Sequence, residues 1–179
     1  MANDNDDIRA RIRTIPDFPK PGIMFRDITT LLLDAEGLRL TIERMAAAVD
    51  GNVDLVAGIE ARGFLFGAAL AVRLGTGLLL IRKDGKLPGA TIAEDYALEY
   101  GTDRIAIHAD ACAPGARVLL VDDLIATGGT ARAAVRLLRK AGAEVSQAAF
   151  VVDLPELGGA EALRSDGIAV NALVAFDGH

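Results

Sequence analysis

The sequence predicts an α/β fold in which an open, mainly parallel sheet is flanked by helices on both faces. Short apolar runs of the length of buried strands alternate along the chain with longer segments of helical period, as in βαβ units. The composition is 51% hydrophobic but only 4% aromatic, so the core consists of Ala, Val, Leu and Ile, as is common where helices pack on a parallel sheet. Ligands in such sheets bind at the carboxyl ends of the strands.

Each element is placed by its hydrophobic period and by the Gly and Pro residues at its ends. Helices are predicted over residues 6–13, 35–49, 62–74, 129–141 and 156–164. Strands are predicted over residues 54–59, 77–81, 104–108, 117–121, 145–152 and 168–174. Residues 14–22 are broken by three prolines. Residues 82–103 show no hydrophobic period and are expected to form a lid that excludes water, or else a mobile loop without a partner.

The chain is expected to form one domain, residues 1–179, because its length suffices for one core and no Pro/Ser-rich linker or charge block divides it. No apolar run is long enough to cross a bilayer, and the first residues are acidic where a signal peptide would be basic. We therefore expect a cytoplasmic protein with no membrane partner. Cys112 is the single cysteine, which excludes an internal disulfide and favours a packing role.

Charge and residue usage argue against two further classes. The net charge of −6 disfavours a nucleic-acid partner, because binding to a phosphate backbone needs clustered Lys and Arg. Serine occurs only at positions 146 and 165 and histidine only at positions 108 and 179, which leaves little from which to build a Ser-His-Asp hydrolase. His108 is expected to pack in its strand and to do no chemistry.

The most informative segment is residues 118–130, where a buried strand leads through two carboxylates into a glycine-rich turn and a helix. Gly128 and Gly129 permit the compact, left-handed backbone that points several N–H groups into one concavity, and the helix that follows adds its positive end. The segment therefore predicts a phosphate site at residues 126–130. The alternative is an ordinary strand end followed by a helix cap.

Asp122 and Asp123 must bind something other than the phosphate, because two carboxylates would repel it. Carboxylates accept hydrogen bonds from sugar hydroxyls, or ligate a divalent metal that the ligand holds in part. The acid pair and the turn together predict a phosphorylated sugar. The chain contains neither a G-x-x-x-x-G-K-[ST] run nor a G-x-G-x-x-G run, so the common ATP and dinucleotide sites are not expected.

A second constellation, Glu60-Ala61-Arg62-Gly63, falls where a predicted strand gives way to a helix. Arg62 would project beside exposed N–H groups, and Gly63 would let an anion approach the backbone, which suits a pyrophosphate. The alternative is a helix whose first-turn Glu and Arg are merely solvated.

These motifs carry a family resemblance. Residues 118–130 resemble the phosphoribosyl pyrophosphate motif of the type I phosphoribosyltransferases, and residues 19–28, 60–67 and 82–89 with 99–101 are similar to the adenine phosphoribosyltransferases of that family. The resemblance runs from near the N-terminus to the end of the chain. It implies a purine salvage enzyme that transfers a 5-phosphoribosyl group from phosphoribosyl pyrophosphate to adenine, giving AMP and pyrophosphate.

The resemblance also implies roles for single residues. Glu99 acts as acid and base on the purine, while Asp122 and Asp123 hold the ribose hydroxyls. The phosphate groups of the substrate are held by Arg62, Arg82, Lys83, Lys86, Ala126, Thr127, Gly128, Gly129 and Thr130. The Glu60–Ala61 peptide is expected to be cis. Mg²⁺ arrives with the substrate, so no closed cage of protein ligands is expected, and a homodimer is expected in which some of these cations reach across the interface.

The base is expected to lie between a small N-terminal hood and residues 153–157, held by Phe25, Arg26, Asp27 and Leu157, and covered by a flexible lid loop. Phe25 and Leu157 suit the two faces of a flat ring, although each could equally be core packing. An adenine amino group needs a carbonyl, whereas a 6-oxopurine is commonly met by a lysine. Residues 153–157 contain no Lys or Arg, which favours adenine.

Two other functions remain open. The first is a phosphoribosyltransferase that acts on hypoxanthine and guanine, or on xanthine. The second is a non-catalytic regulator that senses phosphoribosyl pyrophosphate while binding RNA or DNA, which the acidic charge balance opposes.

Overall fold

A computed structural model describes residues 5–97 and 101–178. The helices are α1 (Asp6–Arg9), α2 (Thr29–Leu33), α3 (Ala35–Ala47), α4 (Gly63–Leu74), α5 (Gly129–Lys140) and α6 (Gly159–Ser165), with a 3₁₀ turn η1 (Pro155–Leu157). The strands are β1 (Arg13–Pro16), β2 (Met24–Asp27), β3 (Leu55–Ile59), β4 (Gly77–Lys83), β5 (Thr91–Ala97), β6 (Thr102–His108), β7 (Arg117–Ile125), β8 (Glu144–Asp153) and β9 (Ala169–Ala175). None of the described helices has the length and apolar content to cross a bilayer.

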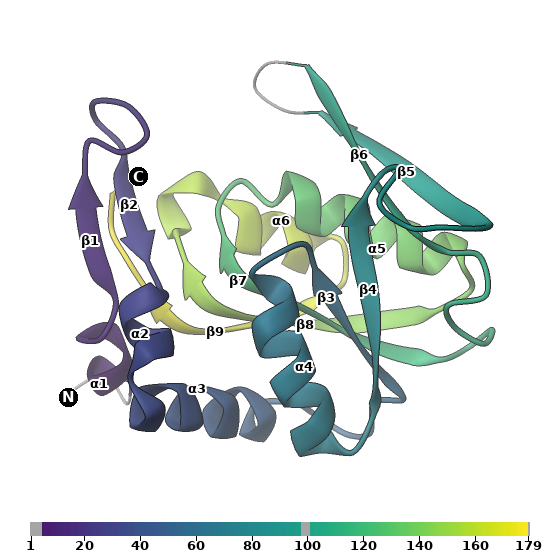
Figure 1. The fold of residues 1–179 in the computed structure, drawn as a ribbon, viewed down its shortest axis with the longest axis horizontal. Coiled ribbons are helices and arrows are strands. Elements are labelled where there is room, and N and C mark those ends of the chain that lie inside the picture. The colour runs from purple at the N-terminus through teal and green to yellow at the C-terminus, as the bar shows by residue number, and fades with distance from the viewer. Residues whose placement is uncertain (1–4, 98–100, 179) are drawn as a thin grey trace.

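The main sheet has the strand order β5-β6-β4-β3-β7-β8-β9. Strands β4, β3, β7, β8 and β9 run parallel to one another. Strand β6 is antiparallel to both β4 and β5. The order changes direction around β3, so the chain places helices on both faces of the sheet (Figure 1). The predicted fold class is confirmed.

Two apolar layers hold the helices to the sheet. On one face, α4 packs Phe66 and Leu70 against Leu119 and Val121 of β7. On the other face, α5 and α6 cover a layer that includes Phe150 of β8. The side chains of both layers are mainly aliphatic, as the composition indicates. Because helices cover both faces of the central strands, ligands reach these strands at their ends.

Strand β7 is longer than its sequence pattern predicts. The predicted strand ended at residue 121, but β7 continues to Ile125 because β8 runs beside it and pairs Asp122 with Phe150 and Leu124 with Val152. The two carboxylates therefore lie within a strand and do not follow it. Their positions are set by the sheet's hydrogen bonds, which are more rigid than a loop.

The segment predicted to be an irregular lid is largely a β-hairpin, and that prediction is wrong for β5 and the start of β6. Strand β5 lies along α5, where Arg136 pairs with Glu94 at 2.7 Å and Lys140 donates to the carbonyl of Ala93 at 3.1 Å. Polar contacts hold this strand in place, so its sequence shows no apolar alternation. Residues 98–100, at the tip, lie outside the described part of the chain.

The proline-broken segment near the N-terminus is partly a strand. Strand β1 pairs antiparallel with β2, and Pro16 at its end lies opposite Met24. Proline is tolerated there because the end of an edge strand need not donate a hydrogen bond. The β1–β2 hairpin, which we call the hood, stands beside the C-terminal end of the chain (Figure 1).

Candidate active site

The two carboxylates of β7 have different surroundings. Asp123 is only 4% exposed, and its Oδ2 accepts a hydrogen bond from Nε of Arg62 at 2.5 Å. Arg62 immediately precedes α4, so this ion pair joins the turn after β3 to the carboxyl end of β7. Asp122 lies beside Gly63, where an added Cβ would come within 2.9 Å of the Asp122 Oδ1. Gly63 therefore permits a close approach of α4 to β7, rather than the approach of an anion that the sequence predicted.

Asp122 is electrostatically unusual. Burial raises the pKa of its carboxyl well above the ordinary value, and the neighbouring Asp123 raises this pKa further. Arg62 and the N–H of Asp123 oppose the rise without cancelling it. A carboxyl held partly desolvated in this way gains most from a positive charge that develops nearby.

The glycine-rich turn encloses a cavity of about 130 Å³ that is lined by Asp122 and by residues 124–131. Gly128 has φ of 80°, the left-handed conformation that the sequence predicted, whereas Gly129 is already the first residue of α5. The first N–H groups of this 12-residue helix have no partner within the helix, and residues 129–131 line the cavity. The structure thus brings together Asp122, Ala126, Thr127, Gly128, Gly129 and Thr130.

Gly159 shapes this turn, although no sequence motif marked it. Its N–H donates to the carbonyl of Ala126 at 3.0 Å. A Cβ on Gly159 would stand 2.3 Å from that carbonyl oxygen and 2.6 Å from the nitrogen of Gly128. The turn therefore rests directly on the first residue of α6. The signal available in the sequence was the second glycine pair, Gly158-Gly159, which nothing in the motif required.

A second cavity, of about 310 Å³, adjoins the first through Leu124, Ala126 and Thr127, which line both. Its remaining lining comes from the hood, from the turn before α4, and from the segment after β8: Ile23, Met24, Phe25, Arg26, Arg62, Leu154 and Leu157. It is mainly apolar, and Phe25 and Leu157 contribute to it as the sequence predicted. A flat apolar group here would lie next to an anion held by the turn.

Two predicted base-binding residues have other partners. Asp27 does not line the cavity: its carboxylate pairs with Arg13 and accepts the N–H of Thr29 at 2.9 Å. The hydrogen bonds from Arg13 and Thr29 lower the Asp27 pKa to about 2. Arg26 lines the cavity, but its guanidinium donates to Thr14 and to the carbonyl of Asp177, each at 2.7 Å. The sequence could not show whether the side chains at these two positions point into the cavity or bond to other residues.

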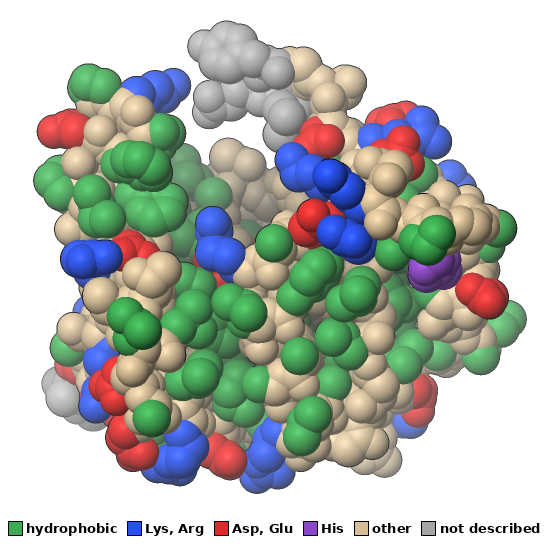
Figure 2. All heavy atoms as spheres, in the orientation of Figure 1, with side chains coloured by type: hydrophobic (Ala, Val, Ile, Leu, Met, Phe, Trp, Pro, Cys, Tyr) green, Lys and Arg blue, Asp and Glu red, His purple; other side chains and the backbone are tan. Residues whose placement is uncertain are grey.

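Three of the predicted pyrophosphate cations, Arg82, Lys83 and Lys86, lie at or just after the end of β4 and outside the lining of both cavities, whereas Arg62 lines the larger one. Arg82 pairs with Glu60 at 3.2 Å, and Lys83 pairs with Asp103 at 3.1 Å. Although partial burial raises the Glu60 pKa, hydrogen bonds from Lys83 N–H and Arg82 outweigh it and lower that pKa. Lys86 follows in the turn after β4 and accepts from Arg82 through its carbonyl at 3.2 Å. Basic and acidic side chains gather below the hairpin tip (Figure 2).

Glu99 lies outside the described residues, so its predicted role is not addressed by the geometry. Its hairpin, however, is tied to the site by a residue that sequence reasoning missed. The Tyr96 hydroxyl donates to Asp103 at 3.0 Å, and Thr130 of the phosphate turn also hydrogen-bonds this phenol. Burial is the main reason why the Tyr96 pKa is raised. Tyr96 therefore links the hairpin to Lys83 through Asp103, and to the turn through Thr130.

Two further features complete the description. The Glu60–Ala61 peptide is cis, which confirms that prediction. Within the described residues, no group of three or more His, Cys, Asp or Glu side chains is arranged to hold a metal ion.

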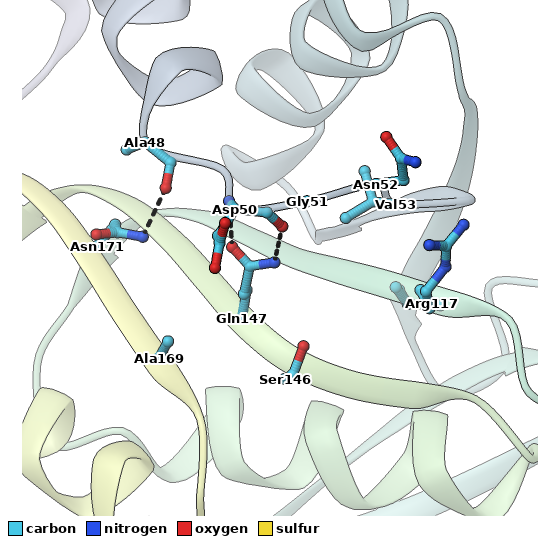
Figure 3. Close-up of a pocket in the computed structure, with 11 residues that line it drawn as sticks. Ala48, Asp50, Gly51, Asn52, Val53, Arg117, Ser146, Gln147, Ala169 and Asn171 are labelled. Carbon is cyan, nitrogen blue, oxygen red and sulfur yellow. Dashed lines mark hydrogen bonds between the residues drawn. The ribbon is translucent and has the colours of Figure 1, made fainter.

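A larger cavity of about 580 Å³ lies at the opposite, amino end of the strands. Figure 3 shows two of its side chains bonded to the main chain: Gln147 exchanges hydrogen bonds with Asp50 at 2.8 and 2.7 Å, and Asn171 donates to Ala48 at 3.1 Å. We assign no ligand to it.

Comparison with known proteins agrees with this geometry. Residues 30–171 match the phosphoribosyl transferase domain family. A protein of Erythrobacter litoralis named adenine phosphoribosyltransferase is 61% identical over 97% of this chain and 98% of its own length. The chain belongs to the adenine phosphoribosyltransferases.

Solved structures of this family superpose closely. The adenine phosphoribosyltransferase of Thermoanaerobacter pseudethanolicus has a TM-score of 0.91 at 49% identity, covering 96% of this chain and 99% of its own. The enzyme of Saccharomyces cerevisiae, solved with an imino-altritol bisphosphate and adenine, has a TM-score of 0.89 at 34% identity, covering 97% of this chain and 100% of its own.

Replacing Gly159 by Ala is expected to displace the phosphate turn, because the new methyl overlaps the main chain of residues 126 and 128. We expect a loss of about 1–3 kcal/mol in the free energy of unfolding, and faster hydrogen exchange at the amides of residues 127–130. Gly158→Ala is the matched control. It meets no atom within 4 Å but has φ of 74°, so it should cost about 1 kcal/mol and leave exchange in the turn unchanged. Equal exchange in both variants would contradict the contact.

Asp122→Asn is expected to stabilise the fold at pH 7. The folded-state pKa of Asp122 is raised, so the folded protein favours the neutral carboxyl, and its ionisation above that pKa costs stability. The amide stays neutral, so the free energy of unfolding should rise by about 1 kcal/mol or more at pH 7. The gain should shrink as the pH falls through the folded-state pKa, and vanish below the ordinary aspartate pKa.

Urea denaturation at several pH values measures the free energy of unfolding. Asp54→Asn is the control, because its effect on that free energy should have the opposite sign. Hydrogen bonds from Arg117 lower the Asp54 pKa to about 2, so its ionised form stabilises the fold. Asp54→Asn should therefore destabilise at pH 7, with the penalty fading as the pH falls towards 2. A destabilised Asp122→Asn protein at pH 7 would refute the assignment.

Proposed function

We propose that this chain transfers the 5-phosphoribosyl group of phosphoribosyl pyrophosphate to adenine, giving AMP and pyrophosphate. The observation that carries the proposal is the junction of the two cavities, where a polar turn at a helix N-terminus meets a flat apolar space through three shared residues. A nucleotide has the same two halves, a phosphate and a base joined by a ribose. The Saccharomyces relative was solved with adenine and a sugar-like bisphosphate, which agrees with this division.

The base cavity favours adenine over a 6-oxopurine. Its lining after β8, at Leu154 and Leu157, is apolar and brings no cation towards the base. Among the described strands β2 pairs with β1 alone, so its other edge can present main-chain carbonyl and N–H groups to a ligand. A carbonyl there can accept from the adenine amino group and an N–H can donate to a ring nitrogen. Arg62 also reaches this cavity, but it is engaged with Asp123.

Catalysis is proposed to be mainly electrostatic. As pyrophosphate leaves, positive charge develops on the ribose, and Asp122 and Asp123 stabilise it while accepting hydrogen bonds from the ribose hydroxyls. The main-chain N–H groups of residues 126–130 and the hydroxyls of Thr127 and Thr130 hold the 5′-phosphate, which orients the sugar for attack by the base. Arg62 neutralises charge on the leaving pyrophosphate.

Mg²⁺ is proposed to accompany phosphoribosyl pyrophosphate. The acid pair fits such an ion, because Mg²⁺ bound through substrate phosphates and water needs only one or two protein oxygens, and Asp122 stands at the cavity beside the turn. When bound, the ion neutralises the leaving pyrophosphate.

The other predicted residues complete the proposed site. Arg82, Lys83 and Lys86 would exchange their present partners for the pyrophosphate, and Glu99 would handle the purine proton. We also propose that residues 1–179 form a single domain, because one apolar layer includes both Ile8 and Phe176, near the two ends of the chain. The proposed compartment is the cytoplasm, because a highly charged sugar phosphate does not cross membranes and is consumed where it is made.

The test of the activity supplies labelled adenine, phosphoribosyl pyrophosphate and Mg²⁺, and follows labelled AMP. We expect turnover with adenine at a kcat/KM at least about 100-fold above that with hypoxanthine, guanine or xanthine, because a site built to pair with an amino group leaves buried groups unpaired with an oxo group. Preference for an oxopurine would move the chain to the alternative enzyme class. No turnover, with tight RNA or DNA binding at physiological salt, would favour a regulator.

A homodimer is proposed from an exposed apolar patch. Leu65 and Val72 of α4 are 51% and 84% exposed, and Leu78 and Leu80 of β4 are 36% and 38% exposed. Figure 2 shows hydrophobic side chains over this face. Contiguous apolar patches of this kind mark interaction surfaces. The patch lies beside the cations at the end of β4, so a second copy seated on it would stand near the proposed pyrophosphate site.

Light scattering is expected to give a mass of about two chains of 18.7 kDa. Val72→Glu should shift the protein to one chain, because it places a charge within the patch. Leu33→Glu is the matched control, since Leu33 is 86% exposed on α2, outside the patch, and the dimer should persist. A wild-type monomer, or a dimer that survives Val72→Glu, would refute this surface.

A further inference from the structure

Phe176, directly after β9, lies where the hood meets the main sheet. It is only 9% exposed, and its N–H donates to the carbonyl of Asp153 at 3.0 Å. Asp153 is the last residue of β8, immediately before the segment that lines the base cavity. Phe176 is thus fastened by its main chain to one wall of that cavity.

The ring of Phe176 holds the other wall. The guanidinium of Arg26 stacks over this ring with its Cζ 4.6 Å from the centroid, and Arg9 of α1 stacks over it at 4.8 Å. Stacking of a guanidinium on an aromatic face is favourable, and most so where water is excluded. Burial, together with the charge of Arg9, lowers the Arg26 pKa, so this site is partly desolvated.

Arg26 belongs to β2, the hood strand that faces the base cavity. Arg26 lines this cavity together with Phe25, but its guanidinium bonds to Thr14 and to the carbonyl of Asp177 and stacks on the Phe176 ring. Phe25 is in turn braced by an edge-on contact with Phe18, at 5.2 Å between ring centroids. The carbonyl of Asp177 accepts a hydrogen bond from Arg26, and the carbonyl of Ala175 accepts one from Arg9. The end of the chain therefore fixes where β2 stands relative to the sheet.

We propose that Phe176 is a positioning residue for the base: its ring and its main-chain N–H together set the distance between β2 and the segment after β8. This inference rests on the proposed function and adds to it the residue that determines how closely the site grips a purine. Phe176 is not a catalytic residue, because it lines neither cavity. A gap of only 0.5–1 Å between a flat ring and its wall forfeits roughly a quarter to a half of the contact energy. Small shifts of β2 should thus weaken base binding selectively.

The test is Phe176→Leu, which keeps apolar bulk but removes the aromatic face. We expect the KM for adenine to rise about 5- to 20-fold, while kcat and the KM for phosphoribosyl pyrophosphate stay within about two-fold. Hydrogen exchange at the amides of residues 24–27 should accelerate. Phe176→Tyr keeps the ring and should behave like the wild type. Arg26→Lys, which keeps the charge without the planar stack, should shift the adenine KM in the same direction as Phe176→Leu.

The matched control is Phe66→Leu, the same substitution in a fully buried core position on α4. It should lower the unfolding temperature without changing the ratio of the two KM values or the exchange of residues 24–27. Phe176→Leu with unchanged adenine KM and unchanged exchange, or with both KM values raised together, would overturn the proposal.

The exchange measurement does not depend on turnover. If the wild type made no AMP, the proposed function would fail, yet exchange in β2 would still decide whether Phe176 holds the hood. If the wild type made AMP and the Phe176 variants matched it in adenine KM and in exchange, this inference alone would fail.

Discussion

The ion pair between Arg62 and Asp123 is the contact on which the rest of the site depends. Asp123 is almost wholly removed from water, and a buried carboxylate without a partner would cost several kcal/mol. Arg62 supplies that partner from the turn after β3, and so joins two neighbouring parallel strands at their carboxyl ends. Burial and the charge of Asp123 raise the pKa of the Asp122 carboxyl, and the charge of Arg62 opposes that rise. One arginine thereby acts on both adjacent acids.

Around this pair the site is assembled from backbone contacts that require small residues. Gly63 lets α4 approach β7, and Gly159 lets α6 support the turn at residues 126–130. Close packing of backbone against backbone fixes positions more precisely than flexible side chains do. A turn supported in this way loses less conformational freedom when a ligand binds to it.

The base side of the site is built differently. The hood is a two-stranded hairpin, which is marginal alone, and it is attached to the sheet through the stacking of Arg26 on Phe176 and through an apolar layer that includes Ile8 and Ile12. The phosphate side is rigid and the base side is held by a few contacts near both chain ends. Affinity for the base is accordingly the property that should respond most to substitutions in the hood and at the C-terminus.

The sequence by itself determined the fold class, the family and the glycine-rich turn before α5. These depend on local signals: the alternation of apolar runs, the left-handed backbone that Gly128 permits, and the order of four motifs. It could not show that β5 is a strand, because contacts with α5 replace the apolar alternation that marks strands, nor that β7 continues past its apolar run, because β8 supplies the pairing. Only the tertiary structure shows that Asp122 and Asp123 have different surroundings and that Asp27 pairs with Arg13. It also shows the contacts that Gly159 and Phe176 make. Each of these depends on residues far away in the chain that meet only after folding, and no local pattern encodes such a meeting.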